Sequence, residues 1–167
     1  MSKKKKIIII CVSAVAVLAL SLLIAVLYVN SGYRTAQGTF GYKITFNTRK
    51  YEFVTSSNSI DMFQIKDLSK TDNDCYVYVG EYDTGQDLQE TIDIVNEEDG
   101  TNLTLMTTTI GSEDYPATFV SFMTEEGGYA HMYYVNYMGR GLVISTLTDK
   151  QHEADIEKML ESFTIVG

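Results

Sequence analysis

The chain has 167 residues, with 22 acidic and 13 basic side chains and a formal net charge of −9 at pH 7. Four of the basic residues are Lys3 to Lys6, whereas every acidic residue lies after residue 29. The nine other basic residues and the 22 acids give the rest of the chain a formal charge of −13. Such a charge argues against binding to nucleic acid or to anionic lipid, because both need a basic surface.

The most apolar stretch is residues 7–29, which contain no charge, glycine or proline. A helix of this length reaches about 34 Å, enough to cross a hydrocarbon core about 30 Å thick. The basic residues 1–6 before it predict a cytoplasmic N-terminus. Residues 26–32 offer no small-x-small cleavage pattern, so we expect an uncleaved, single-pass signal anchor in the cell membrane. The lipid bilayer is thus the first predicted partner, and the chain beyond residue 29 is predicted to be extracytoplasmic.

Residues 30–38 are polar and contain glycine, which predicts a short linker to one domain over residues 39–167. From residue 39 the apolar residues recur with a period of two, the pattern of half-buried strands. This alternation predicts strands over residues 40–47, 51–54, 59–65 and 76–82.

Two amphipathic helices are predicted in the domain. The first begins at Asp87, three residues before Glu90 in a capping-box pattern, with Thr84 as a rival start, and it stops at Gly100. The second covers residues 150–162 behind Asp149 as its cap, with an apolar stripe that ends at Phe163.

Three or four strands are predicted between the two helices, over residues 103–110, 117–124, 129–137 and 142–148. Short glycine-containing turns join the second to the third and the third to the fourth. Consecutive strands joined so tightly are antiparallel. The sequence therefore predicts an α+β domain, a central antiparallel sheet covered by two amphipathic helices, behind an N-terminal transmembrane helix.

The segments 40–47, 87–98, 117–148 and 156–163, with Ser162-Phe163 at the end of the last helix, resemble the PsbP-like fold family. That family includes an extrinsic subunit of photosystem II, a nuclear Ran-binding protein and many small exported bacterial proteins. The resemblance implies a scaffold or binding module rather than an enzyme, and it transfers no functional residue.

No cofactor, metal or catalytic motif stands out in the sequence. Cys11 follows too short an apolar stretch for a lipoprotein signal, and Cys75 is expected to be a buried small hydrophobe without ligand partners. His131 is expected to be structural among the strand aromatics and His152 to be exposed, and their spacing matches no usual metal motif. The acidic clusters at residues 72–74 and 97–99 could hold a hard cation, but solvated loops are the simpler interpretation.

Tyrosine is abundant, with twelve residues in the chain. If exposed together, tyrosines on one strand face make a platform for a protein or a glycan, although tyrosine also suits half-buried strands. Six strand tyrosines are the candidate partner-binding residues: Tyr76, Tyr78, Tyr82, Tyr129, Tyr133 and Tyr137.

Three functions remain open on the sequence alone. The first is a membrane-anchored module that binds a protein or another component of the cell envelope. The second is an accessory or sensor subunit of a membrane complex, and the third is an enzyme with an unrecognised site. Convergent polar groups in a pocket would favour an enzyme, whereas an exposed aromatic face would favour a binding module.

Overall fold

The computed structural model describes residues 17–27, 29, 31–56, 60–66, 75–124 and 128–166. The chain divides into two compact units, Met1–Tyr33 and Arg34–Gly167. In the first unit, residues 17–27 are helical. Among the described residues, no helix is both long and apolar enough to cross a membrane. The predicted span 7–29 includes residues 7–16 and 28, which lie outside the described residues, so the anchor stays a prediction.

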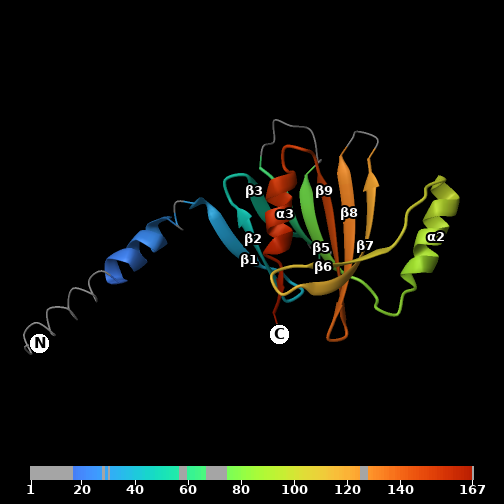
Figure 1. Cartoon of the computed structure of the whole chain (residues 1–167), viewed down its shortest axis with the longest axis horizontal. Coiled ribbons are helices and arrows are strands. Elements are labelled where there is room, and N and C mark those ends of the chain that lie inside the picture. Colours follow the sequence, from blue (N-terminus) through green and yellow to red (C-terminus); the bar gives the residue numbers. More distant parts are fainter. Residues whose placement is uncertain are drawn as a thin grey trace, which may run out of the picture. The chain divides into compact units, whose positions relative to one another are not determined.

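The described strands form two sheets (Figure 1). The smaller sheet has the order β1-β2-β10, with β1 at Tyr33–Gln37, β2 at Tyr42–Asn47 and β10 at Thr164–Ile165. The larger, seven-stranded sheet has the order β3-β4-β5-β9-β8-β7-β6. Each neighbouring pair in it is antiparallel. Its strands are β3 (Tyr51–Ser56), β4 (Ile60–Ile65), β5 (Tyr76–Glu81), β6 (Met106–Ile110), β7 (Tyr115–Met123), β8 (Tyr129–Tyr137) and β9 (Arg140–Thr148). The predicted α+β class with antiparallel pairing is confirmed.

One face of the seven-stranded sheet, which we call the α3 face, carries the main core. Helix α3 (Glu153–Glu161) lies over this face beside β2 (Figure 1). Alternate residues of each strand point to the same side of a sheet, and so Val77 of β5 and Ile144 of β9 lie in this core and are fully buried. Met159 of α3 and Phe163 just after it pack into the same cluster. The predicted apolar stripe of the closing helix is therefore core.

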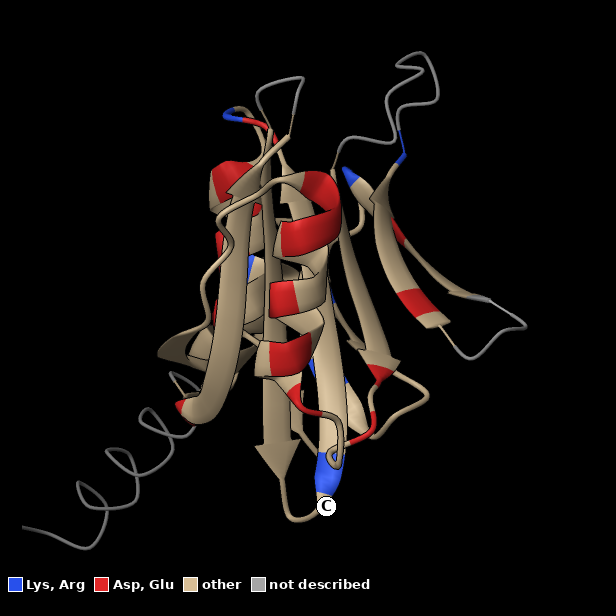
Figure 2. Cartoon of the chain, turned by 90° about the vertical axis from the view of Figure 1, so that its right-hand side faces the viewer, with Lys and Arg blue, Asp and Glu red and all other residues tan. Residues whose placement is uncertain are grey.

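The opposite face, which we call the α2 face, has fewer buried apolar residues. Helix α2 (Leu88–Asp99) begins where predicted, because the Asp87 side chain accepts hydrogen bonds from the next backbone amides, and it ends at Gly100 in the left-handed conformation. Ile92 of α2 is buried, as are Val120 and Ala130 on the α2 face. Figure 2 shows α2 in front of the strands, with acidic residues in its exposed turns.

The structure differs from the sequence prediction in the number of sheets and in several element boundaries. The predicted strand 40–47 pairs with β1 and β10 in a separate sheet, and β1 occupies residues predicted to be linker. β6 begins at Met106 instead of residue 103, because the Asn96 side chain binds both backbone groups of Leu103. α3 begins at Glu153, and Asp149 contacts the backbone N–H of His152, which is the N-cap.

A fully buried carboxylate joins the two sheets. Asp61 of β4 accepts hydrogen bonds from the backbone and hydroxyl of Thr39, from the Tyr42 hydroxyl and from the Thr55 hydroxyl, at 2.7–3.0 Å. The site is so tight that a Cβ on Gly38 would lie 2.5 Å from Asp61 Oδ2. Burial, together with the neighbouring Asp61, raises the pKa of Tyr42 well above its ordinary value, so its hydroxyl stays a donor.

Phe163→Ala should destabilise the fold strongly, because the side chain is fully buried and its ring packs against Tyr42 of the small sheet and Tyr115 of the seven-stranded sheet. We expect a loss of about 3–5 kcal/mol in the free energy of unfolding. Phe122→Ala is the matched control, since Phe122 is 38% exposed on the α2 face and should cost much less. Urea melts of the fragment 31–167 measure both, and equal losses would contradict the assigned core.

Asp61→Asn should also destabilise the fold, because an amide nitrogen replaces one of the two carboxylate oxygens that together accept four hydrogen bonds. A buried donor left without its acceptor costs about 1–3 kcal/mol, so we expect a loss of about that size in the same urea melts. Asp93→Asn makes the same chemical change on the exposed side of α2 and should alter stability by about 0.5 kcal/mol or less. A near-neutral Asp61→Asn would mean that the network does not hold the two sheets together.

Candidate functional site

The six predicted tyrosines do not form one platform, because they lie on opposite faces of the sheet. The pairing of β5 with β9 and of β9 with β8 puts Tyr76 and Tyr78 on the α2 face. The same pairing puts Tyr129, Tyr133 and Tyr137 on the α3 face. All six are half-buried.

On the α2 face, the tyrosines pack against their neighbours. The Tyr82 ring, just past the end of β5, meets that of Tyr134 edge to face at a centroid distance of 5.4 Å. Both side chains are half-buried, and burial raises the pKa of both phenols. These rings therefore serve partly as cover for the sheet.

On the α3 face, the β8 tyrosines have two different roles. Tyr137 packs edge to face on the buried Tyr115, beside Phe163, and belongs with the core. Tyr133 stacks on Phe119 of β7 with centroids 5.6 Å apart, and His131 meets both rings edge to face. As expected from the sequence, His131 is packed among aromatics.

The part of the α3 face on β6, β7 and β8 is only partly covered by α3. We call its apolar side chains the β6–β8 patch, and they are Met106, Phe119, Met123, His131 and Tyr133. Met106 is 41% exposed and Met123 is 66% exposed, whereas the three rings are half-buried. Contiguous exposed apolar side chains of this kind commonly mark an interaction surface.

A groove of about 270 Å³, which we call the α3 groove, runs between α3 and the end of β6 with the turn after it, and Tyr133 is the residue of the patch that lines it. Tyr133 contributes to its floor, and Glu157 and Glu161 of α3 line one side. Burial and then the nearby Glu157 carboxylate raise the pKa of Tyr133. Thr108, Thr109 and Asp114 line the other side, so the groove combines an aromatic ring, hydroxyls and carboxylates.

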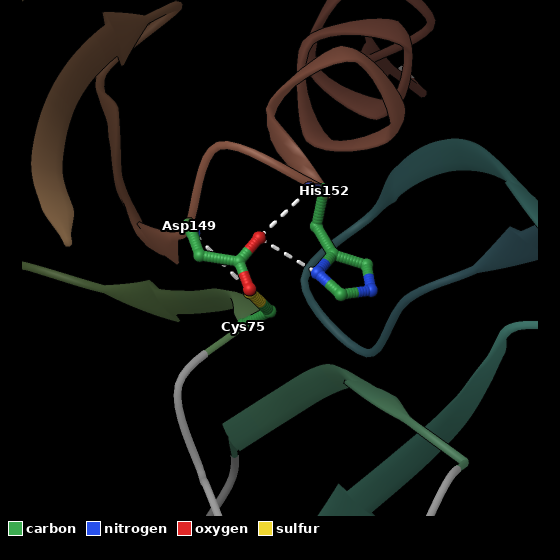
Figure 3. A group of neighbouring side chains, drawn as sticks. All are labelled: Cys75, Asp149 and His152. Carbon is green, nitrogen blue, oxygen red and sulfur yellow. Dashed lines mark hydrogen bonds and ion pairs between the residues drawn. The ribbon is translucent and has the colours of Figure 1, made fainter.

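A second cluster brings together Cys75, Asp149 and His152 at the other end of α3 (Figure 3). Cys75 precedes β5, Asp149 follows β9, and His152 is the N-cap of α3. Their ligand-type atoms all lie within 4.8 Å of one another. Sequence reasoning missed this cluster: Cys75 is buried as expected, but it has partners, and His152 is mostly buried, with only 12% of its side chain exposed, instead of exposed.

The geometry of this cluster does not suit a cysteine nucleophile. His152 Nδ1 lies 2.8 Å from Asp149 Oδ1, and Cys75 Sγ lies beyond the carboxylate and accepts the Asp149 backbone N–H at 3.3 Å (Figure 3). The imidazole ring is thus turned toward Asp149, whereas a base would have to face the thiol. Burial raises the pKa of Cys75, which favours the unreactive thiol.

Asp149 keeps its charge in this cluster. Burial alone would raise its pKa, but hydrogen bonds from the His152 ring and from backbone N–H groups lower the pKa overall. An ionised carboxylate only accepts hydrogen bonds, so His152 Nδ1 carries the proton between them. The cluster therefore holds one carboxylate, one imidazole whose Nδ1 carries a proton, and one thiol. After loss of the Nδ1 and thiol protons, these groups are a donor set suited to a metal ion.

No protein-family model and no curated protein matches the chain. A search of solved structures finds similarity to the solution structure of cyanobacterial PsbP (CyanoP) from Synechocystis sp. PCC 6803. The TM-score is 0.50 at 10% identity, and the match covers 81% of this chain and 93% of that one. This chain has the PsbP-like fold.

This structural similarity confirms the resemblance to the PsbP-like fold that was inferred from the sequence. A sequence identity of 10% is evidence for a shared fold only. The candidate functional residues of this chain are therefore argued from its own geometry. Within the PsbP-like domain, the described residues offer two such places, the α3 groove with its patch and the Cys75 cluster.

His131 should make stability depend on pH. Burial lowers its pKa, while the nearby Glu153 acts in the opposite direction. The unfolded chain then binds this proton more tightly than the folded protein. The corresponding stability is complete above the unfolded pKa of about 6.5 and is lost as the pH falls through the folded value.

We therefore expect the wild-type fragment 31–167 to lose more stability than its His131→Gln variant between about pH 7.5 and about pH 5.5. Urea melts at both pH values measure the difference, and contributions from the carboxylates cancel in the comparison. Identical pH dependence of the two proteins would show that His131 titrates as it does in the unfolded chain.

Proposed function

We propose that this protein is a membrane-anchored binding module, held at the outer side of the cell membrane by residues 7–29, that binds a basic segment of a partner protein. The docking surface is the α3 groove together with the β6–β8 patch. The observation that carries the proposal is a row of exposed carboxylates on α3 beside partly exposed aromatic rings. The anchor, its orientation and the extracytoplasmic location are supported by the apolar stretch 7–29 and the four lysines before it.

The carboxylates follow one another along α3. Glu153, Glu157 and Glu161 are spaced by four residues and so lie on one side of the helix. All three are exposed, and none takes part in an ion pair among the described residues. The neighbouring acid on α3, Asp155, is instead paired with Lys50. A row of like charges attracts a partner of opposite sign.

The aromatic floor suits the same partner. Lys and Arg side chains bind favourably over aromatic faces, worth about 0.5–1 kcal/mol at exposed sites. The stacked pair of Tyr133 and Phe119 lies beside the glutamates, and the exposed Met106 and Met123 extend the apolar surface along β6 and β7. Methionine is common at surfaces that adapt to peptides. A segment with basic and apolar residues therefore fits both the charge and the apolar character of this surface.

The role of the α3 glutamates is tested by calorimetric titration of the fragment 31–167 with an oligolysine peptide. Glu157→Gln/Glu161→Gln should weaken binding about tenfold at low salt, the effect of two lost charge contacts together worth roughly 1.4 kcal/mol. Glu97→Gln/Glu98→Gln is the matched control, because it removes the same charge from α2. An equal loss in both variants would mean that the peptide responds only to net charge.

The role of the Tyr133 ring is tested with the same titration. Tyr133→Leu should reduce the affinity for the peptide, because it removes the ring on the groove floor. Tyr78→Leu changes a half-buried tyrosine of the α2 face and should leave the affinity unchanged. If Tyr78→Leu weakens binding and Tyr133→Leu does not, the docking surface is the α2 face.

A further inference from the structure

We propose that Cys75, Asp149 and His152 form a binding site for a divalent metal ion with one sulfur, one oxygen and one nitrogen ligand, and that Zn²⁺ is the ion it selects. The inference does not rest on the proposed binding function, because it concerns different residues at the opposite end of α3.

The fold itself brings the three ligands together. Cys75 and Asp149 are 74 residues apart in the sequence but lie at the adjacent ends of the paired strands β5 and β9. His152 follows Asp149 by one turn at the start of α3. Each ligand thus lies one residue away from a regular element.

The distances are close to those that a tetrahedral ion needs. Zn–S bonds of about 2.3 Å and Zn–N or Zn–O bonds of about 2.0 Å put neighbouring donor atoms about 3.3–3.7 Å apart. The three donor atoms here lie within 4.8 Å of one another, and Nδ1 and Oδ1 lie at 2.8 Å. Small rotations about side-chain bonds therefore suffice for coordination.

The surroundings also suit an ion. The Asp149 backbone N–H already donates to Cys75 Sγ, and such hydrogen bonds from neighbouring groups stabilise metal-bound thiolates. Cys75 is 4% exposed, whereas 43% of the Asp149 side chain is exposed, so an ion has access from the Asp149 side. Water from that side completes the coordination. Binding replaces the Nδ1 proton of His152 and the thiol proton of Cys75, and both protons leave to solvent.

The ligand set decides which ions fit. Ca²⁺ and Mg²⁺ prefer sites made of oxygen ligands only. A thiolate, an imidazole and one carboxylate favour Zn²⁺, and Co²⁺ takes the same geometry with a visible spectrum. Co²⁺ therefore serves as the spectroscopic probe and Zn²⁺ as the competitor.

The test uses the full chain in detergent, with Cys11→Ser as the common background so that Cys75 provides the sole thiol. Titration with Co²⁺ under reducing, oxygen-free conditions should produce a thiolate-to-cobalt absorption band at one equivalent, and Zn²⁺ should abolish it. Cys75→Ser should lose the band, and His152→Gln should weaken Co²⁺ binding at least tenfold. His131→Gln, which changes the other histidine, should bind as the background does.

X-ray absorption at the zinc edge of the loaded background protein gives a readout that needs no further variant. The proposal expects one sulfur and the remaining ligands nitrogen or oxygen. It is overturned if Co²⁺ gives no thiolate band, if zinc shows only oxygen and nitrogen ligands, or if His131→Gln weakens binding as much as His152→Gln. Displacement of Co²⁺ by equimolar Ca²⁺ would equally overturn it.

Discussion

The buried carboxylate of Asp61 is the constraint on which the arrangement of the domain depends. A buried polar group destabilises the fold unless it is hydrogen-bonded, and the four hydrogen bonds to Asp61 come from β2, from β3 and from the turn before β2. The network therefore fixes where the small sheet meets the seven-stranded sheet. It also places the Tyr42 ring against Phe163, with centroids 5.9 Å apart, and so links this end of the small sheet to the end of α3.

The two candidate sites depend on how the small sheet packs against the seven-stranded sheet. With the small sheet over β3, β4 and β5, helix α3 lies beside β2 and covers only part of the face. The β6–β8 patch is then left partly exposed along one side of the helix, where the α3 groove forms. The start of the same helix places His152 beside the ends of β5 and β9. One helix position thus creates both the acidic, aromatic groove and the cluster of Cys75, Asp149 and His152.

Much of the fold was predictable from local patterns. The alternation in residues 129–137 and the cap at Asp87 depend on neighbours in the sequence, and both elements formed where expected. β1 escaped prediction because its residues, Tyr-Arg-Thr-Ala-Gln, are mostly polar and lie on a small sheet near the surface. The start of β6 was misplaced because a side chain from another element, Asn96, holds Leu103.

The candidate sites were harder to predict because they depend on strand order. Tyr78 and Tyr133 could be assigned to opposite faces only after β5 was known to pair with β9, and β9 with β8. The Cys75 cluster depends on the same pairing, which no local pattern reveals.

The pairing of β10 with β2 has a further consequence, for biosynthesis. Thr45 is hydrogen-bonded to Ser162, 117 residues later, so the small sheet cannot close until both β2 and β10 have been synthesised. Closing so large a loop is entropically costly, and the small sheet therefore closes late and comparatively slowly.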